Sequence, residues 1–101
     1  MIYIIKNEVN HCKIGYSKHP QKRIKQLNTG TSSELSIFKT FETKYDSKIE
    51  AYLKYFFKYQ NIKGEWFDLS SEDIDKVEYL IRIHENALGS LEKPTNLDNI
   101  Y

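Results

Sequence analysis

The sequence predicts an α+β domain, in which a small, mostly antiparallel sheet of three strands is flanked by three helices. Two observations lead to this prediction. Short runs rich in β-branched and aromatic residues alternate with longer runs in which apolar residues recur at helical spacing. In addition, 101 residues suffice for one domain, which we expect to span residues 1–89 and to be followed by a loosely ordered tail over residues 90–101.

The first two strands are expected to form a β-hairpin. Residues 1–5 are an apolar run of β-branched and aromatic residues, and residues 11–16 form a second run of this kind. The segment between them is polar and rich in turn-forming residues. The two strands therefore pair as neighbours joined by a loop of medium length.

A helix and a third strand follow the hairpin. Pro20 is favoured in the first turn of a helix, and Asn28 with Gly30 provides a stop signal. After a polar loop over residues 31–33, residues 35–41 mix alternation with strong β-formers, which predicts a strand.

Two further helices are predicted in the second half of the chain. Asp46 is a candidate N-cap for a helix over residues 47–60, and residues 61–64 read as a turn before a short extended segment over residues 65–69. The last helix is expected over residues 71–88, with a capped, acidic first turn and with Gly89 as its end.

The charge is unevenly distributed along the chain. Residues 1–63 contain 12 Lys or Arg and 5 Asp or Glu, a net charge of +7, whereas residues 64–101 contain 3 and 9, a net charge of −6. A basic body with an acidic C-terminal part suits a protein that meets a polyanion on one side. A solvated, lysine-rich surface gives the same pattern, so the charge alone leaves both interpretations open.

Several classes of protein are excluded by composition. The single cysteine, Cys12, leaves no internal disulfide and no multi-cysteine zinc site. No apolar run approaches the roughly 18 residues of a membrane-spanning helix, and the N-terminus lacks the pattern of a secretory signal. We therefore expect no membrane partner and a cytoplasmic location.

A set of short motifs occurs in a fixed order along residues 1–69. They are Ile2-Tyr3-Ile4, Lys13-Ile14-Gly15, Arg23, Gln26-Leu27-Asn28-Thr29-Gly30, Glu50 and Gly64-Glu65-Trp66-Phe67. Each motif is short, and only the ordered set is specific. The set resembles the GIY-YIG nuclease superfamily, and most closely its small phage and bacterial branch of the T5orf172 or meiotically up-regulated gene 113 type.

The resemblance implies a metal-dependent endonuclease that hydrolyses phosphodiester bonds of DNA. Tyr3 would be the general base, assisted by Lys13 on the neighbouring strand, because a phenol needs a nearby cation to act as a base near neutral pH. Arg23 would contact the scissile phosphate with its planar fork of donors. Glu50 would hold Mg²⁺ or Mn²⁺, with water and substrate phosphate as the remaining ligands.

Further residues are candidates for nucleic-acid binding outside the cleavage point. Tyr16 is expected to join the catalytic cluster or to stack on the substrate, although a role in the core is equally compatible with its position. Lys18, Lys22 and Lys25 are candidate phosphate contacts. Because the chain has room for little more than the catalytic module, specificity would require a homodimer or an accessory protein.

The sequence departs from the family pattern and leaves two other functions open. Met1 stands where the family has the glycine of the first motif, Lys13 stands where familiar members have a tyrosine, and Asn61 is the candidate for a late phosphate-binding asparagine. These departures also fit a catalytically weakened DNA-binding module of the same fold. A third possibility is a phage-type adaptor that binds a protein through the acidic helix beginning near Glu72.

Overall fold

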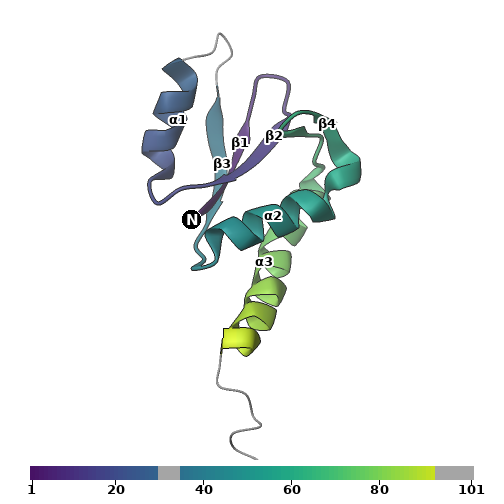
Figure 1. Ribbon diagram of the computed structural model, residues 1–101. Coiled ribbons are helices and arrows are strands. Elements are labelled where there is room, and N and C mark those ends of the chain that lie inside the picture. The colour runs from purple at the N-terminus through teal and green to yellow at the C-terminus, as the bar shows by residue number, and fades with distance from the viewer. Residues whose placement is uncertain (30–34, 93–101) are drawn as a thin grey trace, which may run out of the picture.

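The computed structural model describes residues 1–29 and 35–92 and has the predicted α+β architecture (Figure 1). In chain order the elements are β1 (Ile2–Lys6), β2 (Cys12–Tyr16), α1 (Pro20–Thr29), β3 (Ser36–Phe41), α2 (Asp46–Phe56), the 3₁₀ helix η1 (Lys58–Gln60), β4 (Asn61–Lys63), β5 (Trp66–Phe67) and α3 (Ser71–Glu92). The predicted loop over residues 31–33 and the tail beyond Glu92 lie outside the described residues.

The sheet has five antiparallel strands in the order β3-β1-β2-β5-β4, so the prediction of three strands is wrong. The two additional strands come from the segment that was expected to be a turn followed by a single extended piece. There, β4 and β5 form a small hairpin around Gly64, and β5 pairs with β2 through Cys12 and Lys13. Strands of two or three residues are too short to show a period in the sequence, and pairing with β2 creates them.

The main hydrophobic core lies between one face of the sheet and the helices α2 and α3. Its centre consists of side chains with an exposed fraction of at most 1%: Ile2, Ile4, Cys12, Ile14, Ile49, Leu53, Phe57, Val77 and Ile81. The strands contribute alternate residues to this face, as an antiparallel sheet with two different faces requires. Figure 1 shows α2 and α3 on this side of the sheet and α1 on the other side.

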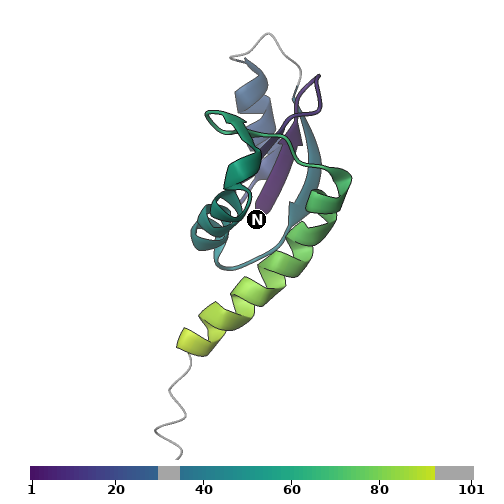
Figure 2. The same ribbon diagram turned by 90° about the vertical axis from the view of Figure 1, so that its right-hand side faces the viewer.

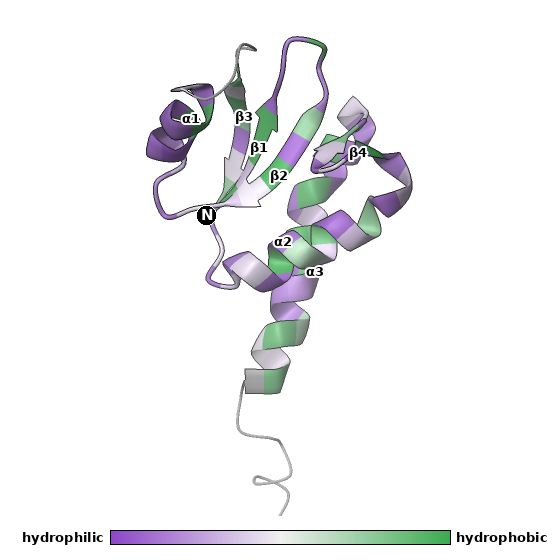
Figure 3. Cartoon of the chain, turned by 45° about the horizontal axis from the view of Figure 1, so that its top comes forward, coloured by the Kyte–Doolittle hydropathy of each residue, from purple (hydrophilic) through white to green (hydrophobic). Residues whose placement is uncertain are grey.

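A smaller cluster lies on the opposite face, under α1. It consists of Tyr3, Ile5, Ile24 and Leu35, and Leu27, Ile37 and Trp66 pack against it. The side chain of Asn28 fastens the end of α1 to the start of β3, because its amide exchanges two hydrogen bonds with the backbone of Leu35, at 2.9 and 3.1 Å. Most of α1 is hydrophilic (Figure 3), so this helix attaches to the sheet by a narrow stripe.

The ends of α2 differ from the prediction. The N-cap residue is Tyr45 instead of Asp46, and the Asp46 carboxylate accepts hydrogen bonds from the N-terminal ammonium of Met1 at 2.7 Å. The helix ends at Phe56, and the chain continues into the 3₁₀ turn η1. The Asp46 carboxylate therefore makes an ion pair with the N-terminus, and the N-cap residue of α2 makes no capping hydrogen bond with its side chain.

The start of α3 follows the prediction, but its end does not. Ser70 Oγ accepts a hydrogen bond from the backbone N–H of Asp73, and the Asp73 carboxylate accepts one from the N–H of Ser70. The helix continues past Gly89 to Glu92. Gly89 does not adopt the positive φ angle with which a glycine commonly ends a helix. The second half of α3 extends beyond the sheet (Figure 2). Within residues 1–29 and 35–92, no helix has the length and apolar character needed to cross a membrane.

Candidate active site

The β1–β2 hairpin brings Tyr3 and Lys13 to the same face of the sheet. In its register Tyr3 lies opposite Gly15, and Ile5 lies opposite Lys13. Because side chains alternate between the two faces, Tyr3 and Lys13 both lie on the α1 side, as diagonal neighbours on adjacent strands. The tyrosine is 4% exposed and belongs to the cluster under α1.

Gly15 makes room for the tyrosine ring. A Cβ atom built on Gly15 would overlap the Cζ and Oη atoms of Tyr3. Only glycine therefore lets the outer end of this ring lie across the neighbouring strand. The glycine of the second motif thus determines the position of the tyrosine of the first motif.

A chain of ion pairs links the sheet to α2. The ammonium of Lys13 lies 2.8 Å from Glu65 Oε2, and the ammonium of Lys54 lies 3.8 Å from Glu65 Oε1. Lys54 also lies 3.4 Å from Glu50 Oε1, one helical turn earlier in α2. The side chain of Lys13 is 17% exposed and that of Glu65 is 60% exposed, so the chain of contacts runs from a half-buried cation to an open surface.

The electrostatics of Glu65 report a third cation near this chain. A hydrogen bond from Lys13 is the main cause that lowers the pKa of Glu65; burial opposes it, and the charges of Lys13, Lys54 and Arg23 add to the lowering. Arg23 is exposed on α1, and its charge makes the smallest of these contributions. Lys13 and Glu50, which come from two different elements, are therefore linked through Glu65 and Lys54, whereas Arg23 acts on Glu65 through its charge alone.

Two members of this cluster were not among the predicted site residues. Lys54 follows Glu50 by four residues on a predicted helix, and this spacing is itself a signal for an ion pair. Glu65 lies in the Gly-Glu-Trp-Phe motif, and the sequence does not show which basic residue it contacts. The partner is Lys13, since β5 pairs with β2 at Trp66 and Lys13.

Tyr16 does not join the cluster. It lies opposite Ile2 in the hairpin and therefore on the α2 side of the sheet, away from Tyr3 and Lys13. Its side chain is 46% exposed at the end of β2. Three alternatives were stated for Tyr16: the strand alternation places it on the other face from Tyr3 and Lys13, its exposure does not fit a place in the core, and contact with a ligand stays a prediction.

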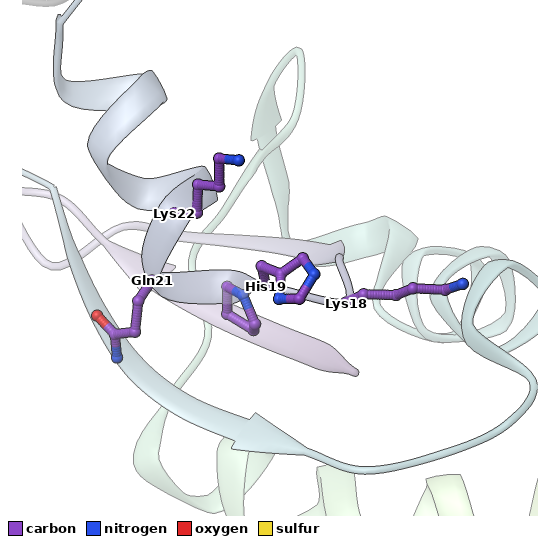
Figure 4. A pocket seen from close by; sticks show the side chains of 5 residues that line it. Lys18, His19, Gln21 and Lys22 are labelled. Carbon is purple, nitrogen blue, oxygen red and sulfur yellow. The ribbon is translucent and has the colours of Figure 1, made fainter.

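The three lysines near α1 are exposed, as the prediction of phosphate contacts requires. Lys18 and Lys22 line an open hollow of about 520 Å³ at the start of α1, together with His19, Pro20 and Gln21 (Figure 4). The side chains of Lys18 and Lys22 point outward in different directions. Lys25 lies one turn further along the same helix.

The remaining candidates for binding a phosphate or a metal ion are Asn61 and the acidic residues. The Asn61 amide donates hydrogen bonds to the carbonyls of Gly64 and Trp66, at 2.9 and 3.0 Å, so it stabilises the β4–β5 hairpin. In the described part of the chain, no three His, Cys, Asp or Glu side chains lie close enough together to hold a metal ion by themselves. The carboxylates at the cluster are those of Glu50 and Glu65, separated by the ammonium of Lys54.

One of three comparisons with known proteins gave a match. No match was found among curated proteins or among solved structures. A scan against family models matched the T5orf172 domain over residues 1–82, which includes the whole sheet, the ion-pair cluster and the first half of α3. A match over most of the chain establishes the family, and the protein therefore belongs to the T5orf172 domain family.

Proposed function

We propose that this protein is a small DNA endonuclease that depends on Mg²⁺ or Mn²⁺ and hydrolyses phosphodiester bonds. The observation that supports this most directly is the chain of ion pairs that links Lys13 to Glu50 through Glu65 and Lys54, with the charge of Arg23 acting on Glu65. Cations and a carboxylate at one surface are what a phosphoryl-transfer site needs. Membership of the T5orf172 family, which is associated with nuclease-like proteins, supports the same conclusion.

Glu50 would hold the metal ion. Mg²⁺ at phosphoryl-transfer sites commonly binds one or two carboxylates and fills its other positions with water and substrate phosphate. The Glu50 side chain fits this role because it is 23% exposed and its observed partner, Lys54, has Glu65 as a second acceptor. When bound, such an ion would neutralise charge that develops on the phosphoryl oxygens.

Tyr3 is the proposed general base, and Lys13 assists it. The ring of Tyr3 is fixed by its contact with Gly15, so the hydroxyl has a defined position above the neighbouring strand. Lys13 lies on the same face and supplies a positive charge that favours the phenolate. The phenolate that Lys13 favours would take a proton from water, which leaves a neutral phenol on Tyr3 and a hydroxide that attacks the phosphorus.

Arg23 binds the scissile phosphate in competition with Glu65. Without DNA, the Glu65 carboxylate balances the charges of Lys13 and Lys54 and lies within the field of Arg23. An incoming phosphate brings its own negative charge to these cations, and the guanidinium can bind it through two donors. Lys18, Lys22 and Lys25 extend the basic surface and hold the backbone of the DNA beside the site.

A second candidate is a DNA-binding module of the same fold without turnover. The observation that favours it is the 2.8 Å ion pair between Lys13 and Glu65, which uses the charge that Tyr3 would need. The methionine in place of the first-motif glycine is a second departure. Such a module would keep a DNA affinity that falls with salt, because phosphate contacts release counterions.

The test is nicking of supercoiled DNA by the full chain with Mg²⁺ or Mn²⁺ and with a chelator. Glu50→Gln should lower the nicking rate by about a hundredfold or more, the scale expected for the loss of a group that stabilises developing charge. Glu85→Gln is the matched control, because Glu85 is also a helical carboxylate in an ion pair and has a side-chain exposure of 22%. It should nick at the wild-type rate.

Two outcomes would overturn the enzymatic proposal. One is a folded protein that nicks in neither metal, and the other is nicking by Glu50→Gln at the rate of the wild type. In the first case, DNA affinity that falls with salt and does not respond to chelator would favour the binding module.

A further inference from the structure

A basic and aromatic surface lies where α2 passes into η1. The segment 54–63 contains three lysines, no acid and four aromatic residues, of which Phe57 is buried in the core. Tyr59 is 88% exposed and Tyr55 is 67% exposed. Single exposed apolar residues are common on soluble proteins, so exposure by itself does not indicate a binding site.

A lysine joins the two tyrosines into one surface. The ammonium of Lys58 lies 4.2 Å from the ring centroid of Tyr55 and 5.1 Å from that of Tyr59, within the range of a cation–π contact. The order along this surface is therefore ring, cation, ring. Since Lys58 covers part of each ring and both rings remain largely exposed, flat aromatic surface stays available to a ligand.

This surface adjoins the candidate active site. Lys54, the residue before Tyr55, makes the ion pairs with Glu50 and Glu65. The end of α2 and η1 lie beside the β4–β5 hairpin that carries Glu65 (Figure 1). Because Lys54 and Tyr55 are consecutive, a strand with one phosphate at the cluster would have a short span to cross before it reached the tyrosines.

We propose that Tyr55, Lys58 and Tyr59 form a stacking platform for unpaired bases of single-stranded DNA. Charge complementarity selects this ligand, because the segment has no acidic residue and Lys58 adds a positive charge at both rings, while Lys54 is already paired with Glu50 and Glu65. Exposed rings stack on the face of any base, and the cations next to them bind the adjacent phosphates. The bases of a duplex already stack on one another and are not free to do so. The choice of DNA rests on the proposed function, but binding does not require cleavage.

The test measures binding by the full chain in the presence of a chelator. The probes are a labelled oligothymidine of about 12 nucleotides and a duplex of the same length, followed by fluorescence anisotropy. The variant Tyr55→Ala/Tyr59→Ala should bind the single strand at least about tenfold more weakly and the duplex within about twofold of the wild type. The variant Tyr55→Phe/Tyr59→Phe should bind the single strand like the wild type, because it keeps both rings.

Tyr79→Ala is the matched control. Tyr79 is 67% exposed, as is Tyr55, but lies on the acidic helix α3, so its removal should leave both affinities unchanged. The proposal is overturned if the alanine variant binds the single strand like the wild type, if it loses single-strand and duplex affinity equally, or if the phenylalanine variant loses as much as the alanine variant. A wild-type chain that does not bind oligothymidine also overturns it and leaves a protein as the partner of this surface.

The platform and the nuclease can fail separately. A chain that nicks no DNA but loses single-strand affinity in the alanine variant disproves the enzyme and keeps the platform. A chain whose nicking depends on Glu50, and whose alanine variant binds normally, disproves the platform and keeps the enzyme.

Discussion

The two faces of the sheet differ in what they contain. The face toward α2 and α3 is covered by a large apolar cluster, in which Ile49, Leu53 and Phe57 are fully buried. The face toward α1 has a smaller cluster, and Lys13 and Tyr3 lie on it beside a hydrophilic helix. One face thus supplies most of the buried apolar area, and the other carries the polar groups of the candidate site.

The difference between the two faces of the sheet explains how a domain of this size accommodates a polar site. A half-buried lysine needs a counter-ion, and Glu65 provides one from a hairpin at the edge of the sheet. These polar groups contribute little to the stability of the fold, and the apolar face of the same strands contributes most of it. Substitutions on the two faces should therefore have different effects on stability and on DNA binding.

The largest expected difference comes from the same substitution on each face. Ile49→Ala should lower the free energy of unfolding by about 4 kcal/mol, and Ile24→Ala by about 2 kcal/mol, because the fully buried site leaves the larger cavity. Ile24→Ala should also weaken DNA binding, since Ile24 anchors the helix that carries Arg23. Denaturant unfolding and DNA affinity would check both effects. Equal losses of stability would show that the two faces contribute alike.

A smaller loss is expected from Gly15→Ala, about 1 to 3 kcal/mol, because the new methyl group overlaps the buried ring of Tyr3. Replacing the tyrosine as well, by Tyr3→Val, should remove the overlap. The double variant should therefore lose less stability than the sum of the losses of the two single variants. Gly89→Ala is the control, since its Cβ would lie 3.8 Å from Tyr45 Oη in ordinary contact and the helix favours alanine. Thermal and denaturant unfolding of the four variants would decide; strictly additive losses would contradict the contact.

The smallest effect is expected from two carboxylates whose pKa is lowered, Glu65 and Glu85. A carboxylate with a lowered pKa stabilises the fold above its unfolded value of 4.5, and this contribution is lost as the pH falls through the lower folded value. When the pH falls below 4.5, the free energy of unfolding of Glu65→Gln and of Glu85→Gln should each decrease less than that of the wild type. The difference should be about 0.5 kcal/mol, as for exposed pairs.

The two variants should differ in DNA binding. Glu65→Gln removes a negative charge from between Lys13 and Lys54 and should raise DNA affinity by about threefold at neutral pH, the scale of one exposed ion pair. Glu85→Gln, beside Arg82 on α3, should leave the affinity unchanged. Titrations with DNA at constant salt would measure this. An equal response of both variants would contradict the assignment of Glu65 to the DNA-binding site.

Much of the fold could be predicted because its signals are local. The β1–β2 hairpin, the start of α1 at Pro20 and the capping of α3 at Ser70 each depend on neighbouring residues, and the structure confirms them within a residue or two. The strands β4 and β5 were missed because they are too short to have a period of their own. The end of α3 was predicted too early because Gly89 permits a stop without enforcing one.

The candidate site was predictable in part for a different reason. Tyr3, Lys13, Arg23 and Glu50 follow from the order of motifs, and their catalytic roles stay predictions. Tyr16 was assigned to this group as an alternative, but the period of two in β2 turns it to the other face.

The sequence by itself determined the three helices, the strands β1 to β3, the alternation that separates the two faces, and the family, since each depends on the type or the order of residues along the chain. Only the tertiary structure decided that Glu65 is the counter-ion of Lys13 and that Lys54 connects it to Glu50. These contacts form when β5 pairs with β2 and α2 packs beside that edge. The partners of a charge depend on distances across the folded chain, and no local pattern encodes those distances.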